Sequence, residues 1–444
     1  MLFAVAMAVA LGAEPRRVSL SEALELARRH PVLETARLRV EAAGGDVSAA
    51  RAAWLPTAGA LGELVVGTAN NSTATVFSSP AVDLARIGAT KVSASAELSP
   101  EASTLVAVGL RQPVWDFGRT AAQIAVAEGA LASVQEGARA TTLDLSVSVR
   151  RAYLQVLLTR AVLEASTEAT VRARAHRDFA HAAVSAQLRP PVDLTRAEAA
   201  LARSEVDEQR AQSDVRLARV RLAAAVGVEA PELDAEPLAD PTPAPLPDEA
   251  TVVAAAEADP VLKAALAAAR VRLSQADLAE AQSRPSIALT ASVSARNGGA
   301  APSSGTSPYG EGFVPDVPNY AAGVVFSWPF LDLVAANRAG AAATRARLGV
   351  PDVAALHLAL VSSARAGLER ARVTEQALSA LARAADAARA NAAQADARFT
   401  AGLSTITELA DAEDLRTSAE IAQAVGRFTA LDARAVLDRF LGKE

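Results

Sequence analysis

The stretch LVAVGLRQPVWDFGR, Leu105–Arg119, marks a change from one kind of secondary structure to another. Val106, Val108 and Leu110 alternate with smaller or more polar residues, which is the pattern of a strand with one apolar face. Pro113 has no N–H group for a strand ladder, so it should end the strand. Beyond the stretch, apolar residues recur with a helical period for about 65 residues. The stretch therefore predicts a short strand that leads into a very long helix.

The second half of the chain repeats this junction in Gly323–Asp332, which reads GVVFSWPFLD. Other segments match in the same order, and the halves differ in length between their two strands, where a loop tolerates insertions. We therefore expect a tandem duplication in which each half reads helix, strand, loop, strand, long helix, helix. The matching segments are His30–Leu33 with Asp259–Leu262, Pro56 with Pro285, and Leu188–Leu194 with Leu403–Leu409.

The duplication predicts two repeats, at residues 18–228 and 248–442, joined by a linker at 229–247 that is rich in Pro and Asp. In the first repeat we expect a helix to Trp54, with a pause at His30-Pro31, and then two strands at Pro56–Thr68 and Leu105–Val114. The loop between the strands, at 69–103, should be partly strand near Lys91–Leu98. A helix from Arg119 should break at Gln187, and another should run from Asp193 to Val226. In the second we expect one helix at Asp248–Ser283, strands from Pro285 and at Tyr320–Pro329 around a loop at Asn297–Pro318, one long helix to Phe399, and a last helix to Phe440.

Composition narrows the class of protein. The net charge is −6 and no basic stripe suits nucleic acid, while aromatic residues make up only 4%, which is thin for one large globular core. Alanine and arginine dominate the helical stretches, as in long, closely packed helices. The chain has no cysteine, which excludes disulfides, thiolate metal sites and a lipidated N-terminal cysteine. A coiled-coil seam is expected at Leu145, Val149, Ala152, Val156 and Leu163, which follow heptad spacing.

The N-terminus carries an apolar run, Leu2–Leu11, of signal-peptide length, with small residues for cleavage before Ala13. The basic residues that usually precede such a run are missing. Either the start codon was assigned late, so that residues 1–13 are a clipped signal peptide, or the run is not a signal, and we expect the former. The run is shorter than the roughly 18 apolar residues of a membrane-spanning helix.

The third strand shows the alternation most clearly. Leu289 and Val293 point to one side with Ile287 and Ala291, and Ser292 points to the other with Ser286, Thr290 and Ser294. Strands of about ten residues have the length that crosses a membrane. The tryptophans Trp54, Trp115 and Trp328 all lie where a strand meets a helix, as in an interfacial aromatic belt.

Four strands cannot close a barrel, and an open sheet edge is not tolerated in lipid. Several chains must then share one barrel, with eight strands from two chains or twelve from three. The alternative is a soluble coiled-coil scaffold whose short strands form a small β-sandwich. Detergent dependence and heat-modifiable oligomers would distinguish the two.

The segments QPVWDFGR, SWPFLD and FTAGLSTITELADAEDL, with the duplicated plan, resemble the TolC-like outer membrane efflux protein family over Val18–Gly442. The resemblance implies a mainly α fold with a membrane β-barrel: a homotrimer that forms a twelve-stranded barrel in the outer membrane of a Gram-negative bacterium and a long α-helical tunnel in the periplasm. It implies a passive exit duct of a tripartite efflux or secretion system, whose partners are a periplasmic adaptor (membrane fusion) protein and an inner-membrane pump. The motifs do not specify drug, metal or protein cargo. Because Gln187 stands where the second half has Gly402, the first turn should be less regular.

No enzyme motif is present: the chain has no phosphate-binding glycine loop, no GxSxG and no histidine cluster with metal-ligand spacing. We expect no catalytic activity, cofactor or metal. His176 and His181 lie five residues apart, so they do not share a helix face and should be surface residues.

Glu408 and Asp411, three residues apart, share one helix face after the second turn. They can simply offset the positive end of the helix dipole. The family resemblance implies instead that they form acidic rings at the narrow end of the tunnel, after Phe399, which stands where a tyrosine is usual. Rings of acids favour cations. The resemblance also implies that the two turns, with Leu188 and Arg189 in one and Gly402, Leu403 and Ser404 in the other, are the tips that dock with the adaptor.

Overall fold

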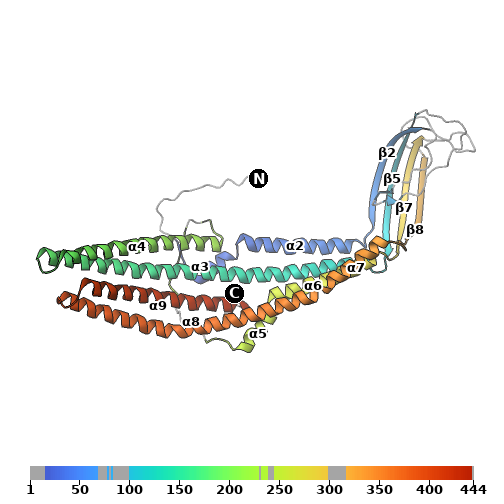
Figure 1. Ribbon diagram of the computed structural model, residues 1–444. Helices are drawn as coiled ribbons and strands as arrows, with labels where there is room; N and C mark the ends of the chain where they lie inside the picture. Colours follow the sequence, from blue (N-terminus) through green and yellow to red (C-terminus); the bar gives the residue numbers. More distant parts are fainter. Residues whose placement is uncertain are drawn as a thin grey trace, which may run out of the picture. The chain divides into compact units, whose positions relative to one another are not determined.

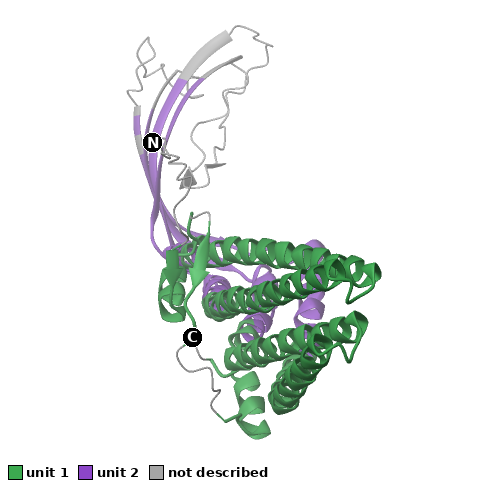
Figure 2. Cartoon of the chain, turned by 90° about the vertical axis from the view of Figure 1, so that its left-hand side faces the viewer, with its two compact units in different colours: residues 1–39, 135–264, 353–444 green, residues 40–134, 265–352 purple. Residues whose placement is uncertain are grey.

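The computed structural model describes residues 16–68, 78–79, 82–83, 100–229, 232–238, 245–298 and 317–442 (Figure 1). The chain divides into two compact units, coloured separately in Figure 2, and each is described by itself. Unit 1 comprises Met1–Arg39, Gln135–Ala264 and Val353–Glu444, and unit 2 comprises Val40–Val134 and Ala265–Asp352. Several long helices therefore begin in one unit and continue into the other.

Unit 2 contains a four-stranded antiparallel sheet in the order β2-β5-β7-β8. The four strands predicted from the alternating pattern are thus confirmed. A second, two-stranded sheet pairs β3 with β4. The strands are β2 Thr57–Thr68, β3 Ser78–Ser79, β4 Val82–Asp83, β5 Pro100–Trp115, β7 Ser286–Gly298 and β8 Val317–Ser327. The strand expected near Lys91–Leu98, and most of the loops expected at 69–103 and 297–318, lie outside the described residues.

The prediction that Pro113 ends its strand is wrong, because β5 continues to Trp115. The ladder to β7 shifts register between Pro113 and Trp115, so the missing proline N–H falls at an irregularity where no regular ladder bond is lost. The Gln112 side chain bridges the same point: its Nε2 donates to the carbonyl oxygens of Trp54 and Pro113, each at 2.8 Å.

The aspartate shared by the two junction motifs has a structural role in each half. Asp116 Oδ2 accepts a hydrogen bond of 2.7 Å from the Thr120 N–H, in the first turn of α3, Arg119–Ser185. Asp332 caps α7, Leu333–Arg347, by accepting from the N–H groups of Val334 and Ala335 at 2.9 Å. Each strand is therefore followed by a helix whose first free N–H groups already have an acceptor.

Prolines break two helices that the sequence pattern predicted to be continuous. The helix expected at 248–283 is two helices, α5 Glu249–Glu257 and α6 Pro260–Ala281, which matches the break between α1 Leu20–Ala27 and α2 Pro31–Ala52. The helix expected to run to Phe399 is α7 and then α8, Gly349–Thr400. Pro351 lies in the first turn of α8, where its missing N–H costs nothing, whereas inside a continuous helix it would remove a hydrogen bond.

Unit 1 contains two long antiparallel helix pairs. One consists of α3 and α4, Pro191–Val226, and the other of α8 and α9, Ile406–Phe440 (Figure 1). Two short strands, β1 Arg16–Val18 and β6 Leu233–Ala235, pair in parallel and complete the unit. The predicted seam is confirmed at its centre, since Val149 and Val156 are fully buried with Leu145 and Ala152 packed against the same cluster.

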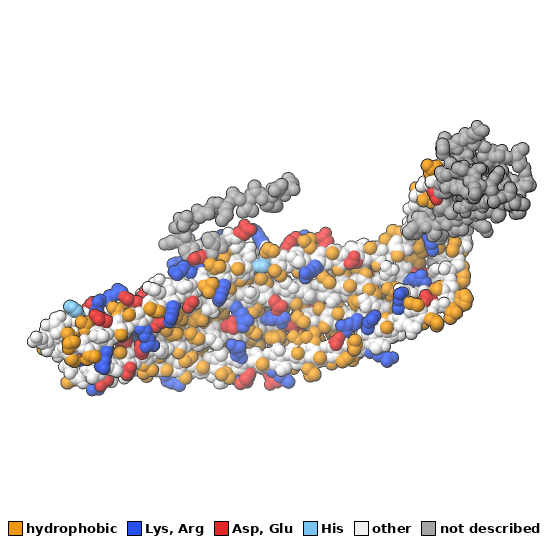
Figure 3. All heavy atoms as spheres, turned by 45° about the horizontal axis from the view of Figure 1, so that its top comes forward, with side chains coloured by type: hydrophobic (Ala, Val, Ile, Leu, Met, Phe, Trp, Pro, Cys, Tyr) orange, Lys and Arg blue, Asp and Glu red, His pale blue; other side chains and the backbone are white. Residues whose placement is uncertain are grey.

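Charged side chains of both signs are interspersed with apolar ones along the helices (Figure 3). Among the described residues, no helix combines the length and the apolar character needed to cross a membrane.

Candidate functional site

The candidate site is the end of unit 1 where both helix pairs turn. The first turn joins Ser185 of α3 to Pro191 of α4, and the second joins Thr400 of α8 to Ile406 of α9. Both turns lie at the same end of the unit in Figure 1. The structure therefore brings together the five residues predicted as tips, which are Leu188, Arg189, Gly402, Leu403 and Ser404.

The expectation that the first turn is less regular is wrong. Gln187 adopts the left-handed conformation with φ 63°, and Gly402 adopts it with φ 74°. The N–H of Leu188 donates to the Ala183 carbonyl at 2.9 Å, and that of Leu403 donates to the Arg398 carbonyl at 2.8 Å. Both turns thus close with the same bond from the residue after the left-handed position, as in a Schellman motif.

Arg189 connects the two turns. Its Nη2 donates to the Phe399 carbonyl at 2.8 Å and its Nη1 to the Ser404 carbonyl at 3.2 Å, so it binds both ends of the second turn. The guanidinium also lies 4.2 Å from the centre of the buried Phe399 ring and 3.5 Å from the Asp193 carboxylate. Burial strengthens these charged contacts, because only 14% of the Arg189 side chain and 10% of the Asp193 side chain are exposed.

Glu408 and Asp411 lie in the first turns of α9 and both are exposed. The cap of this helix is Thr405, whose side chain accepts from the Glu408 N–H at 3.3 Å. In the part of the chain that the structure describes, neither carboxylate makes an ion pair or a side-chain hydrogen bond. The two acids are therefore available to solvent or to a neighbouring molecule.

Asp411 also lies on the wall of a cavity of about 550 Å³ between α3, α4 and α9. Contacts between the two helix pairs border it: Arg203 of α4 pairs with Asp414 of α9 at 3.1 Å, and Arg196 donates to the Thr407 hydroxyl at 3.3 Å. The cavity thus lies between the helix pairs.

The expectation that His176 is a surface residue is wrong, and the sequence did not reveal its contacts with the other helix pair. Its side chain is 19% exposed and lies between Asp396 of α8 and Glu413 of α9. Arg172, one turn earlier on α3, binds Glu413 at 2.7 Å. The spacing of Arg172 and His176 does place them on one helix face, which is the signal that could have indicated a shared partner. His181 is exposed, as expected.

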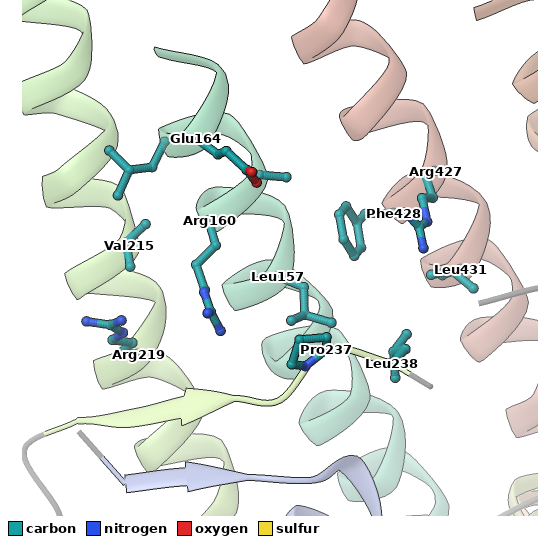
Figure 4. A pocket seen from close by; sticks show the side chains of 12 residues that line it. Leu157, Arg160, Glu164, Val215, Arg219, Pro237, Leu238, Arg427, Phe428 and Leu431 are labelled. Carbon is teal, nitrogen blue, oxygen red and sulfur yellow. The ribbon is translucent and has the colours of Figure 1, made fainter. Parts of the chain in front are cut away.

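A second cavity, of about 480 Å³, lies farther along unit 1 between α3, α4, α9 and the residues after β6 (Figure 4). Arg160 and Arg219 on its wall both bind the buried Asp234 of β6, at 3.4 and 2.9 Å. Phe428 and Leu431 of α9 form an apolar side of the same cavity. The arginines here neutralise a buried carboxylate and so attach β6 to the helices.

The predicted interfacial tryptophans lie in unit 2 at the strand–helix junctions. Trp115 and Trp328 are more than half exposed, and Trp54 is partly exposed. Trp115 packs edge-on against Phe117, and Trp328 against Phe330, each with ring centres 6.1 Å apart. The two phenylalanines were missed, although each stands two residues after its tryptophan in the repeated motif.

Within the described ranges, no group of three or more His, Asp or Glu side chains is placed to hold a metal ion.

Known proteins place the chain in a family. The outer membrane efflux protein family matches residues 22–228 and 251–443. No curated protein sequence matches the chain. The fold is similar to the CmeC outer membrane channel of Campylobacter jejuni, with TM-score 0.79 and 11% identity over 95% of this chain and 85% of that one. It is also similar to the outer membrane protein VceC of Vibrio cholerae, with TM-score 0.74 and 19% identity over 96% of each chain. The open state of the Neisseria gonorrhoeae MtrE outer membrane channel matches with TM-score 0.70 and 21% identity over 96% and 89%.

The chain belongs to the outer membrane efflux protein family. Its place is the outer membrane, with a helical tunnel part that extends into the periplasm. The family consists of efflux channels rather than enzymes.

Proposed function

We propose that the protein is the passive exit duct of a tripartite efflux or secretion system, and that three copies of the chain form it. The observation that supports this most directly is the outer face of the four-stranded sheet, which is apolar and yet exposed. The large side chains on it that are at least 45% exposed include Leu64, Val106, Val108, Leu110, Leu289, Val293, Tyr320, Val324 and Phe326. So large an exposed apolar surface indicates a membrane or a partner rather than water.

The opposite face of the sheet is smaller and more polar. Ala107, Ala288 and Ser294 are buried there, and Ser292 and Thr290 alternate with the apolar positions of β7. This is the arrangement of a strand with lipid on one side and a polar interior on the other. The sandwich alternative would require a second layer over the apolar face, and the exposure of that face argues against it.

The edges of the sheet indicate how copies would associate. β2 and β8 are its two edge strands, and each has one side without a strand partner among the described residues. All neighbouring strands are antiparallel, so β8 of one copy can continue the pattern with β2 of the next. Twelve strands from three copies would leave no edge in the membrane.

The first test concerns assembly. Protein solubilised in mild detergent should be a trimer by light scattering, and a monodisperse monomer would overturn the proposal. Val293→Arg should cost roughly 2–4 kcal/mol, because it places a charge on the proposed lipid face near the middle of β7. Ser292→Arg, on the opposite face of the same strand, is the matched control and should be tolerated.

We also propose that Glu408 and Asp411 line the constriction of the duct. Both are exposed and unpaired within the described residues, and three copies would place six such carboxylates around one axis. Rings of this kind prefer cations. The alternative, in which the acids only offset the helix dipole for about 0.3–1 kcal/mol each, predicts no effect on the pore.

The test is the reversal potential in planar bilayers under a salt gradient, for the wild type and for Glu408→Gln with Asp411→Asn. The wild type should be cation-selective near neutral pH, and the double variant should lose the preference while it stays trimeric. Glu205→Gln, an exposed acid on α4 that contacts Arg174, is the control. An unchanged reversal potential in the double variant would leave the capping alternative standing.

The two turns are proposed as the docking surface for a periplasmic adaptor. Leu188 and Leu403 follow the left-handed residues of the two turns and are 79% and 71% exposed. Leu403→Asp should abolish export and leave the trimer intact, whereas Leu403→Met should behave as the wild type. Normal export by the Leu403→Asp variant would show that this turn is not needed for docking with the adaptor.

We further propose that residues 18–228 and 248–442 arose by duplication. Support comes from the elements that recur in both halves: a break before a proline, two strands, an aspartate cap and a left-handed turn.

A further inference from the structure

His176 occupies the contact between the two helix pairs of unit 1. Its Nδ1 is 3.7 Å from Asp396 Oδ1 on α8, and its Nε2 is 3.8 Å from Glu413 Oε1 on α9. The Nε2 atom is buried and has no hydrogen-bond partner. One imidazole on α3 thus faces two carboxylates on two helices of the other pair.

Arginines already satisfy the other buried carboxylates of this contact. Arg172 Nε binds Glu413 at 2.7 Å, and its Nη2 donates to the Thr417 hydroxyl at 3.3 Å. Glu420 is held by Arg389 and Arg416 at 2.8 and 3.3 Å. By contrast, His176 is the only ion-pair partner of the Asp396 carboxylate in the part of the chain that the structure describes.

Two arginines of α4 that line the cavity are paired as well. Arg203, Asp207 and Arg210 line the cavity that His176 borders. Arg203 binds Asp414, and Arg210 binds Asp207 at 3.4 Å. The charged groups closest to His176 are Asp396, Glu413 and Arg172, which together carry one net negative charge when ionised. Asp411 of α9 and Asp214 of α4 line the same cavity and add negative charge to it.

Neutral and protonated imidazole differ in what they can do here. The neutral ring donates from one nitrogen only, so one of the two carboxylates gains no hydrogen bond. The imidazolium donates from both nitrogens and can bind both carboxylates.

We propose that His176 is a proton-operated clasp between the α3–α4 pair and the α8–α9 pair, which is tighter when the imidazole carries a proton and can donate to both carboxylates. The clasp is a property of the helix contact; only its consequence, a duct that opens less readily in acid, rests on the proposed function.

Glu413 sets the lowest pH at which the clasp can work, because the clasp needs its carboxylate to be ionised. Burial by itself raises its pKa, but the nearby His176 ring and the Arg172 guanidinium bound to the carboxylate outweigh burial and hold the pKa of this carboxyl below its usual range. A group with a lowered pKa in the folded state contributes stability above its unfolded pKa and loses it as the pH falls through the folded value. Glu413 therefore stays ionised in mild acid and remains available as a partner for the imidazolium.

The experiment is hydrogen exchange on the full detergent-solubilised protein at pH 7.5 and 5.5, with rates corrected for intrinsic pH dependence. The readout is protection of peptides that cover residues 396–413. In the wild type, protection should rise several-fold in acid, and in His176→Gln the rise should disappear. His181→Gln, an exposed histidine five residues along the same helix, is the control and should respond as the wild type.

Asp396→Asn tests the same idea without touching the imidazole and should remove most of the response, because the half-exposed carboxylate is the partner that only His176 satisfies. The Asp396→Asn variant also provides the test if His176→Gln does not fold. An acid response that persists in either variant would overturn the clasp. If the variants lose the exchange response but the wild-type protein conducts equally at both pH values in bilayers, the clasp stands. In that case its proposed effect on the opening of the duct is wrong.

Discussion

The two turns of unit 1 have the same backbone but are stabilised differently. The second turn is locally complete: Gly402 takes the left-handed conformation without a side-chain penalty, and the Thr405 side chain caps α9. The first turn places Gln187 in that conformation, and the residue before α4, Pro190, makes no side-chain cap. For a residue with a Cβ the left-handed conformation costs roughly 1–2 kcal/mol.

The difference shows how a turn can retain its geometry with unfavourable residues. Arg189, in the first turn, binds the carbonyl groups of the second turn and the Asp193 carboxylate at the start of α4. Both turns thus share the contact that Arg189 makes, but only the second also has a glycine at the left-handed position and a side-chain cap of its own. Substitutions in the two turns should therefore have unequal effects.

The largest effect is expected for Arg189→Met. It leaves the buried Asp193 carboxylate without its cation, and breaking a buried pair costs about 3 kcal/mol or more. Hydrogen exchange at the Leu188 and Leu403 amides should show a corresponding loss of local stability in both turns. Arg196→Met, which removes an exposed hydrogen bond to Thr407, is the control and should change either amide by less than about 0.5 kcal/mol. Equal effects of the two variants would mean that the turns do not depend on each other.

A smaller effect is expected at the left-handed positions. Gly402→Ala should destabilise the second turn by about 1–2 kcal/mol, purely through φ, because a Cβ at Gly402 meets nothing within 4 Å. Gln187→Gly should be neutral or slightly stabilising, since relief of the left-handed strain is offset by about 0.5–1 kcal/mol of glycine flexibility. The measurement is the same amide exchange. Destabilisation by Gln187→Gly would show that the glutamine side chain itself supports the turn.

The smallest effect is expected for the cap. Thr405→Ala should cost about 1 kcal/mol, because the Glu408 N–H loses its acceptor, and Thr405→Ser should restore it. Exchange of the Glu408 amide reports the difference directly. Identical exchange in the alanine and serine variants would mean that the cap contributes nothing to α9.

Local patterns predicted the elements well, because alternation and helical period depend on neighbours in sequence. β2, β7, α3 and α9 have ends close to those expected. Proline was less informative, since its effect depends on the partner strand at Pro113 and on the start of a new helix at Pro351.

The site was predictable in position but not in its connections. The turns could be located from the duplication and the acids from their spacing after the second turn, and their pore and docking roles remain predictions. The burial of His176 and the reach of Arg189 could not be predicted, because both depend on which helix pairs lie side by side in space. A left-handed Gln187 likewise depends on hydrogen bonds that composition does not reveal.

The open sheet of unit 2 also has a consequence for how the protein is made. A newly synthesised copy presents an apolar face and two edge strands that lack an outer partner among the described residues, and such edges are templates for indiscriminate pairing and aggregation. Correct association is second order or higher in protein concentration, and so is misassociation through the same edges. The yield of functional protein therefore depends on how long a single copy waits in the periplasm, and a holding chaperone that shields the sheet would increase it.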